Sequence, residues 1–373
     1  MILVSITCVV LAMKLLITGP NFYNINNMVA RAFRDLNHTV SILDWPILSG
    51  TIGHRAWLFV LQKLNVLSTP SELSKVRYNL LKETIVEYNK KLLQTVLTKQ
   101  PDVLLVLKGD IILPRTLKKI RENTMTCTVI WCYDSVLRLN NVLEGGKYYH
   151  LFYTFEPTDV QVLDRCGIRA SFLPMAYDPY TYYKLKDRKE VRDIAFIGTL
   201  GGYPERRKIL EALILRYNSL QIDIWGKAWT WYNPFLLYEY KMRRRALGRH
   251  VKNYNIPPTE VNKIYNTSRI CLNIHHAQSM HGVNPRTFEI LGSGSFQLVD
   301  CKRILGELFE IGKEIECFKN EKELFDKVEY YLENDSERRR ISERGYYNAK
   351  RKHTYKSRAK VIMEDLEAIC NAL

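Results

Sequence analysis

The feature that most constrains this chain is an alternation of short apolar runs with amphipathic stretches, which begins near residue 15 and begins again at Ile194. In the first half, helices are expected at 22–36, at 71–98 and after Pro114, between apolar runs at 15–18, 39–45, 102–107 and 127–134. Continuous apolar runs between helices are typical of parallel strands that are buried on both faces. The sequence therefore predicts an α/β fold with two doubly wound, Rossmann-like domains that face a central cleft.

A polar run separates the two halves. Residues 184–193, "KLKDRKEVRD", show no apolar period and are the best candidate for a linker. This predicts an N-terminal domain at 13–183, a C-terminal domain at 194–345 and a helical segment at 346–373. The length of 373 residues and the hydrophobic content of 46% suit two separate cores.

The first twelve residues form an apolar extension whose status the sequence leaves open. "MILVSITCVVLAMKLLITGP" resembles a signal or membrane anchor in length, but no basic cluster precedes it and Lys14 interrupts it. The first expected strand begins at Lys14, so residues 1–12 have no place in the alternation. An upstream start codon explains them more simply than an anchor does.

Charge and cysteine content narrow the class of protein. The net charge of +16 suits anionic partners, which include nucleotide phosphates, nucleic acid and acidic membranes. The closest cysteines, Cys127 and Cys132, lack the spacing of a metal site and have no second pair nearby. We therefore expect the eight cysteines to be reduced thiols in a cytoplasmic protein that binds no metal.

Doubly wound domains bind ligands outside the carboxyl ends of their strands, so the loops there are the candidate site. "IGTLGGYPERRK" places Gly198, Gly201 and Gly202 before Pro204, which suits the first turn of a helix. Glycines let a backbone approach an anion, and a helix N-terminus favours negative charge. Standing alone, this loop is more typical of an ordinary βα turn with solvated arginines.

The stretch "HGVNPRTFEILGSGSFQLVD" strengthens the case for a ligand. Asn284 is a good N-cap, which predicts a helix that begins at Pro285 and turns Arg286 and Glu289 towards the cleft. A carboxylate near a helix start either compensates the helix dipole or accepts two ribose hydroxyls. Both interpretations of Glu289 remain open from the residues alone.

Several segments together resemble the CgeB-like, spore-maturation type glycosyltransferases. They are "FIGTLGGYPERRKIL", "LNIHHAQSMHGVNPRTFEILGSGSFQLVD", "YYLENDSERRRISERGYYNAKRKHTYKSR", "WCYDS" and "FLPMAYDP". The resemblance implies a GT-B fold in which the C-terminal domain binds a nucleotide-sugar donor and the acceptor approaches from the N-terminal domain. It also implies that the final helix, from about Tyr355, packs back on the N-terminal domain.

The resemblance also implies roles for individual residues. Glu289 corresponds to the last glutamate of a Glu-x7-Glu pattern and would bind the donor ribose, while His281 stands where the first glutamate is missing and would meet the transferred sugar. The loop from Gly198 to Gly202 would bind the diphosphate, with Arg207 and Lys227 as cations and Asn284 and Arg286 close by. Because there is no Asp-x-Asp cluster, we expect an enzyme that needs neither a metal nor another cofactor. The resemblance to the Glu-x7-Glu enzymes implies that it is retaining. Its donor would be a UDP-, GDP- or dTDP-sugar, and its acceptor a glycan, protein or lipid.

Three further features have two interpretations each. Asp134 either acts as a base or belongs to a turn. Only one of His275 and His276 can point towards the ligand, and that histidine either contacts the ligand or packs in the core. The basic, aromatic segment Trp229–Tyr254 suits an anionic bilayer, an acceptor or simple solvation. The rival functions are therefore another GT-B enzyme, such as a nucleotide-sugar epimerase, and a non-catalytic protein that binds sugar or, less favoured, nucleic acid.

Overall fold

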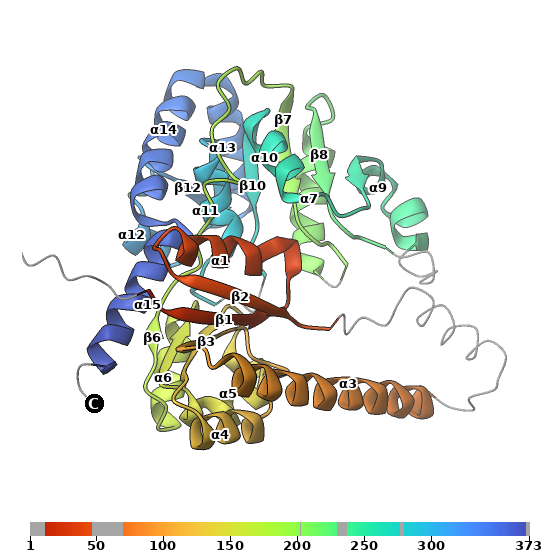
Figure 1. Ribbon diagram of the computed structural model, residues 1–373. Coiled ribbons are helices and arrows are strands. Elements are labelled where there is room, and N and C mark those ends of the chain that lie inside the picture. The colour runs from red at the N-terminus through yellow and green to blue at the C-terminus, as the bar shows by residue number, and fades with distance from the viewer. Residues whose placement is uncertain (1–11, 47–69, 202, 230–236, 277–279, 371–373) are drawn as a thin grey trace, which may run out of the picture.

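The computed structural model describes residues 12–46, 70–201, 203–229, 237–276 and 280–370 of the chain. It contains two parallel sheets, one above the other, with helices on their faces (Figure 1). Each sheet has six strands among the described residues. The predicted α/β architecture of two doubly wound halves is confirmed.

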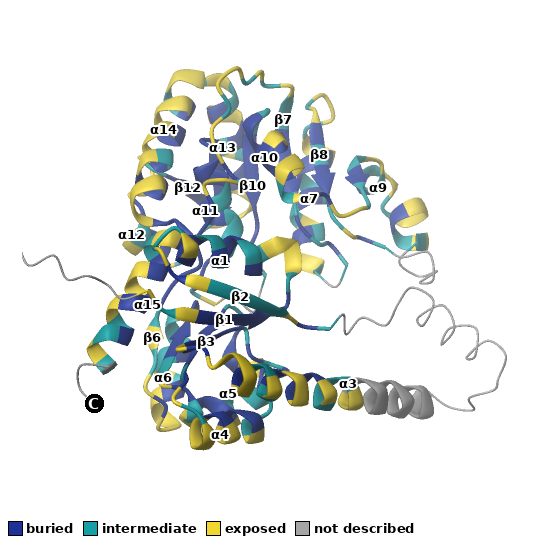
Figure 2. Cartoon of the chain, viewed as in Figure 1, coloured by how far each residue is buried: buried dark blue, intermediate teal, exposed yellow. Residues whose placement is uncertain are grey.

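The N-terminal sheet has the strand order β2-β1-β3-β4-β5-β6. Its strands are β1 Lys14–Gly19, β2 Thr39–Asp44, β3 Val103–Leu107, β4 Cys127–Cys132, β5 Leu151–Thr154 and β6 Ser171–Phe172. The helices between them are η1 Phe22–Asn24, α1 Ile25–Arg34, α3 Pro70–Lys99, α4 Pro114–Asn123, η2 Val136–Arg138, α5 Asn140–Gly145, η3 Gly146–Tyr148 and α6 Pro157–Arg165. All five residues of β3 are buried, as an unbroken apolar run predicts for a central strand (Figure 2).

The C-terminal sheet has the order β12-β11-β10-β7-β8-β9, which is the order of a dinucleotide-binding fold. Its strands are β7 Arg192–Ile197, β8 Ile222–Trp225, β9 Val251–Lys252, β10 Ser268–Asn273, β11 Gln297–Asp300 and β12 Glu316–Phe318. The helices are α7 Pro204–Arg216, η4 Glu239–Arg243, α9 Arg245–His250, α10 Pro258–Asn266, α11 Pro285–Gly292, α12 Leu305–Leu308, α13 Glu321–Glu333, α14 Asp335–Lys352 and α15 Tyr355–Cys370. The two short strands β9 and β12 were not predicted from the sequence.

The last two helices connect the two halves. In Figure 1, α14 lies beside the C-terminal sheet, and α15 returns to the N-terminal one, where it contacts α1. The buried Arg358 donates to the carbonyls of Pro174 and Met175, and Asp365 accepts from the hydroxyl of Tyr153 at 2.5 Å. The chain therefore crosses between the sheets twice.

The first crossing follows β6 and includes the segment predicted as a linker. Hydrogen bonds attach it to the C-terminal half. Asn262 and Asn266 accept from the backbone N–H groups of Tyr183 and Leu185, at 3.1 and 2.9 Å. Arg188 donates to the carbonyl of Gly294. These contacts make the segment an integral part of the C-terminal surface despite its polar composition.

The expectation that all cysteines are reduced thiols is wrong for one pair. Cys301 and Cys317 form a disulfide whose Cα atoms lie 5.1 Å apart. Cys301 directly follows β11, and Cys317 lies in β12. These two strands are adjacent and parallel. The pairing could not be anticipated because β12 itself was not recognised. The expectation of thiols holds for four other described cysteines, Cys127, Cys132, Cys166 and Cys271.

Candidate active site

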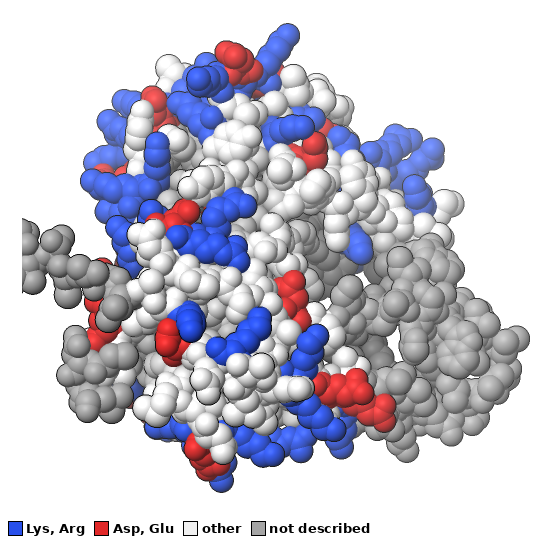
Figure 3. All heavy atoms as spheres, viewed as in Figure 1, with Lys and Arg blue, Asp and Glu red and all other residues white. Residues whose placement is uncertain are grey.

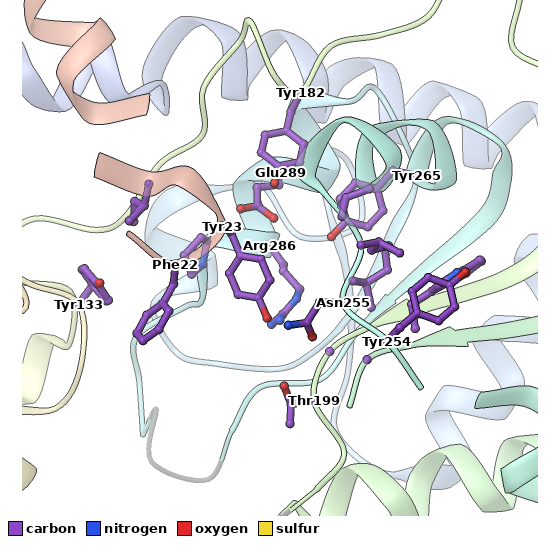
Figure 4. A pocket seen from close by; sticks show the side chains of 18 residues that line it. Phe22, Tyr23, Tyr133, Tyr182, Thr199, Tyr254, Asn255, Tyr265, Arg286 and Glu289 are labelled. Carbon is purple, nitrogen blue, oxygen red and sulfur yellow. The ribbon is translucent and has the colours of Figure 1, made fainter. Parts of the chain in front are cut away.

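A pocket of about 350 Å³ lies between the carboxyl ends of the two sheets. The C-terminal half contributes Gly198, Thr199, Asn255, Arg286 and Glu289, among others. The N-terminal half contributes Phe22, Tyr23, Ile25 and Tyr133. In Figure 4, Tyr23, Arg286 and Asn255 point towards the same space, and Glu289 lies beside Tyr182. This is where the switch points of two doubly wound sheets would place a ligand.

Glu289 forms part of the pocket wall and has an unusual protonation equilibrium. Its surroundings raise the pKa of its carboxyl to about 7, because burial among aromatic rings outweighs the nearby Arg286 charge and the hydrogen bond with Tyr182. The tyrosines Tyr182 and Tyr265 also line the pocket. A carboxyl group with few hydrogen bonds to the protein is free to accept hydrogen bonds from the hydroxyl groups of a ligand.

The helix that carries Glu289 begins as the sequence predicts. Asn284 is the N-cap of α11 and accepts from the N–H of Thr287 at 3.2 Å. Its amide also exchanges hydrogen bonds with the buried Asn273, which in turn donates to Gln297. Asn284 therefore fixes the start of α11, while Arg286, the second residue of this helix, lines the pocket.

The glycine loop after β7 packs on the loop after β8. A Cβ atom on Gly226 would lie 2.2 Å from the carbonyl oxygen of Gly198, so the glycine at 226 permits this close backbone approach. Gly198 lines the pocket, whereas Gly201 donates to the carbonyl of Lys227, whose side chain is exposed. Gly202 lies outside the described residues. Of this loop, the structure thus brings Gly198 and Thr199 into the pocket.

Two adjacent arginines on α7 have different environments. Arg207 lies against Glu239, 4.0 Å away, and is used within its own domain. Arg206 is buried and donates to the carbonyls of Thr199 and Ile274, at 3.1 and 2.9 Å. Burial and the charge of Arg286 lower the pKa of Arg206 to about 10. An anion bound beside Arg206 and Arg286 would relieve the repulsion between these two cations. The sequence analysis favoured Arg207 as the phosphate cation and so missed this role of Arg206.

The histidines after β10 are held by protein groups. His275 is buried, and both its backbone N–H and its ring Nδ1 lie 2.7 Å from Asp300. Burial opposes ionisation of Asp300, but the hydrogen bonds and charge of His275 outweigh burial, so the pKa of Asp300 is lowered. His276 packs edge-on against Tyr203. The structure does not place His275 on the pocket wall; its position suits the packed alternative.

The two residues expected to take part in catalysis also lie off the pocket wall. The side chain of His281 lines a second cavity of about 230 Å³, together with Thr158, Gln161 and Arg303. Asp134 lies 3.8 Å from Lys108 and 3.6 Å from Arg138. The structure therefore does not bring His281 and Asp134 together with Glu289 in one pocket.

The aromatic part of the pocket was missed from the sequence. Phe22 and Tyr23 are 62% and 55% exposed, which is unusual for large rings, and they follow β1. Tyr23 and Asn24 have positive φ angles of 52° and 68°. Such left-handed conformations are costly for these residues and cluster at functional sites. This loop follows the carboxyl end of β1, where a doubly wound domain binds ligands, but its aromatic residues gave no specific signal in the sequence.

The described residues offer neither a metal centre nor a membrane span. No three His, Cys, Asp or Glu side chains converge there as metal ligands do. None of the helices in the described part combines the length and apolar character needed to cross a membrane.

Comparisons with known proteins agree with this geometry. A family model described as "Glycosyl transferase-like" matches residues 206–364, somewhat less than half of the chain. Sucrose-phosphate synthase from Thermosynechococcus elongatus has a similar structure, with a TM-score of 0.67 at 10% identity over 97% of this chain and 100% of that one. The chain has the GT-B glycosyltransferase fold.

Two further GT-B structures extend the comparison. HepE of Anabaena, in complex with UDP, gives a TM-score of 0.62 at 12% identity and covers 95% of this chain and 100% of its own. The α,α-trehalose 6-phosphate synthase of Burkholderia multivorans gives 0.63 at 12% identity, over 97% and 99%. A search of curated proteins found no match. The predicted GT-B fold is confirmed, and the family-model match agrees with a glycosyltransferase; the CgeB-like subfamily stays a prediction.

Proposed function

We propose that this protein transfers a sugar from a nucleotide-sugar donor to an acceptor, with the donor bound in the pocket around Glu289. The observation that carries this proposal is the meeting of a carboxyl and a guanidinium, Glu289 and Arg286, with the Gly198 loop in one pocket between the two sheets. Glu289 would accept ribose hydroxyls. The positive groups beside it would face the diphosphate.

The chemistry needs a stabilised leaving group. When the sugar leaves, negative charge develops on the nucleoside diphosphate, and helix N-termini and fixed cations stabilise such charge. Arg286 and the start of α11 line this side of the pocket, and the buried Arg206 lies behind it, bonded to the carbonyl of Thr199. These groups supply the charge that a metal ion provides elsewhere, which supports metal-independent transfer.

Three neighbouring structures support a UDP-sugar as the first donor to test. HepE of Anabaena has been solved in complex with UDP, with UDP and glucose, and with UDP-glucose. GDP- and dTDP-sugars are the alternatives. We propose that the base contacts the segment that follows β9, where Tyr254, Asn255 and Ile256 line the pocket.

The proposal includes retention of configuration at the transferred sugar, by resemblance to the Glu-x7-Glu enzymes. His281 and Asp134 would act in catalysis only after a movement that brings them to the donor, because their side chains lie outside this pocket. NMR of the first product formed would distinguish a retained from an inverted anomer. A kcat that is unchanged in both His281→Ala and Asp134→Ala would remove these residues from the mechanism.

A membrane contact is proposed at the described part of the basic segment, because four of its cations are exposed: Lys241, Arg243, Arg245 and Arg249. Tyr238 and Met242 beside them are 63% and 66% exposed. Figure 3 shows positive side chains gathered over α9, at the upper right. Such a surface suits anionic lipids, and each cation there contributes about 1 kcal/mol. The rest of the segment, 230–236, lies outside the described residues.

Sedimentation with vesicles tests this contact. The protein should bind vesicles that contain phosphatidylserine and release them at high salt, and a variant with Lys241, Arg243, Arg245 and Arg249 replaced by Ser should not bind. Vesicles of phosphatidylcholine alone are the control. Equal binding of the parent and the variant would place the contact elsewhere.

Titration calorimetry with UDP, GDP, dTDP and UDP-glucose is the test of the proposed function. We expect one diphosphate to bind in the presence of EDTA, and the matching nucleotide sugar to release diphosphate only with an acceptor. Interconversion of the donor without any acceptor would show an epimerase instead. Binding of none of these ligands, together with salt-dependent binding of nucleic acid, would overturn the proposal.

A further inference from the structure

Glu156 is a buried carboxylate that belongs to one half of the protein and is bonded to the other. It is the N-cap of α6 in the N-terminal half and is 1% exposed. Its side chain does not cap its own helix. One oxygen accepts from the backbone N–H of Gly282 at 2.9 Å, and both accept from that of His281, at 3.1 and 3.2 Å.

The partner loop is shaped for this contact. A Cβ atom on Gly282 would lie 2.7 Å from the carbonyl oxygen of Phe155 and 3.2 Å from Glu156 itself. Only a glycine therefore lets the two loops come this close without a shift. The hydroxyl of Thr158 completes the arrangement by donating to the carboxylate at 3.0 Å.

This contact lies next to the donor pocket along the chain. Gly282 is followed by the buried Val283, by the N-cap Asn284 and then by α11, which carries Arg286 and Glu289. Asn284 is fixed from within the C-terminal half by Asn273. The loop is thus held at one end by its own domain and at the other by Glu156.

We propose that Glu156 is a positioning residue for donor binding, which holds the loop before α11 and keeps the two halves closed around the pocket. The inference rests on the proposed function. An ionised acceptor that is fully buried favours its N–H donors strongly, because both would otherwise lose water without replacement. Opening the cleft would leave the carboxylate and two N–H groups to find other partners. Glu156 therefore couples the closed arrangement to the geometry of α11.

Two substitutions should break the contact from opposite sides. Glu156→Ala removes the acceptor, and Gly282→Ala inserts a Cβ where the carbonyl of Phe155 lies. Each should weaken UDP binding on the order of tenfold, the cost of about one charge-assisted hydrogen bond. Because both changes break one contact, the double variant should bind UDP no more weakly than the worse single variant.

Two milder variants serve as controls. Glu156→Gln keeps an oxygen for the N–H groups and can donate to Thr158, so its affinity for UDP should lie within about threefold of the parent. Thr158→Val removes the hydroxyl but leaves the bonds to His281 and Gly282, and should behave similarly. If Gly282→Ala does not fold, Glu156→Ala and Glu156→Gln still test the inference.

Calorimetry with UDP, kcat and KM for the donor, and hydrogen exchange at the His281 and Gly282 amides are the measurements. We expect Glu156→Ala to raise KM, weaken UDP binding and speed exchange at both amides. Unchanged UDP affinity with a lower melting temperature would show a merely structural role, and tighter binding would show that Glu156 competes with the ligand; either result overturns the inference. If the parent binds no nucleotide, the proposed function fails, and protected amides in the parent that exchange faster in Glu156→Ala would still show the contact itself.

Discussion

The two walls of the pocket differ in chemistry. The C-terminal wall carries the ionisable groups, Glu289 and Arg286, on a capped helix, with the buried Arg206 close by. This wall also has aromatic rings, such as Tyr265, but they stand beside the charges. The wall from the N-terminal half carries Phe22, Tyr23 and Tyr133. A charged, rigid wall suits a nucleoside diphosphate, whereas aromatic rings suit the less polar faces of a sugar or an acceptor. This difference is the one that the proposed division of the reactants between the two halves requires.

Glu289→Ala gives the sharpest test of this division. An ionised acceptor bonded to a hydroxyl contributes about 1.5–3 kcal/mol, so affinity for UDP should fall about tenfold to a hundredfold. The fold should be retained, since the group lines a pocket and its burial disfavours the charged form. Calorimetry with UDP, and melting temperature as the control, check both claims. Unaltered affinity would make Glu289 a residue that merely compensates the helix dipole.

The two arginines of α7 provide a matched pair for the diphosphate. Arg206→Met should weaken UDP binding about tenfold, because it removes a buried cation that repels Arg286 until an anion arrives. Arg207→Met should have a smaller effect, since Arg207 lies near Glu239 and away from the pocket. Titrations of UDP and of uridine separate a phosphate effect from a general one. If Arg207→Met weakens UDP binding more than Arg206→Met does, Arg207 binds the diphosphate, as the sequence suggested.

The parts of the site that could be predicted from sequence are those with local signals. The N-cap Asn284, the following proline and the helical spacing of Arg286 and Glu289 lie within six residues, and the structure forms the helix they predict. Glu156 and Gly282 are 126 positions apart, and no periodicity links them. The same holds for the disulfide of Cys301 and Cys317, which depends on the short strand β12. Long-range contacts between loops need the fold first.

Sequence patterns also fail to show which surface segments are bonded to the rest of the protein. Residues 184–193 have the composition of an exposed linker, yet Arg188 and Glu190 bond to the C-terminal half, the latter to the buried Arg338 at 2.8 Å. Polar side chains can form hydrogen bonds and ion pairs with one another as readily as they form hydrogen bonds with water. Composition alone cannot distinguish the two cases.

The protonation of Glu289 should make donor binding depend on pH. Its pKa of about 7 lies above the ordinary 4.5, so the carboxyl is largely neutral at pH 6 and ionised at pH 8. If the ionised form is the one that binds ribose, UDP affinity should rise up to about tenfold over this range. Stability should move the other way: the advantage of the neutral carboxyl is complete below about pH 4.5 and is lost as pH rises through about 7.

Glu289→Gln is the control for both pH effects. UDP itself titrates near neutral pH, so the difference between the parent and the Gln variant isolates the carboxyl. The variant should keep a flatter affinity profile and lose less melting temperature between pH 5 and pH 8. Parallel profiles for the two proteins would show that Glu289 does not titrate in this range.

Tyr23 is the matching test on the aromatic wall, with the smallest expected effect. Its backbone has a φ of 52°, which glycine adopts at no cost and alanine does not. Tyr23→Gly should therefore keep the loop conformation and remove only the ring, whereas Tyr23→Ala removes the ring and retains the strain. Both should raise KM for the acceptor about threefold, a typical value for one aromatic contact of about 0.5–1.5 kcal/mol. UDP affinity should stay constant in both. If instead the donor's KM rises and the acceptor's does not, the aromatic wall belongs to the donor, and the division of reactants between the two halves fails.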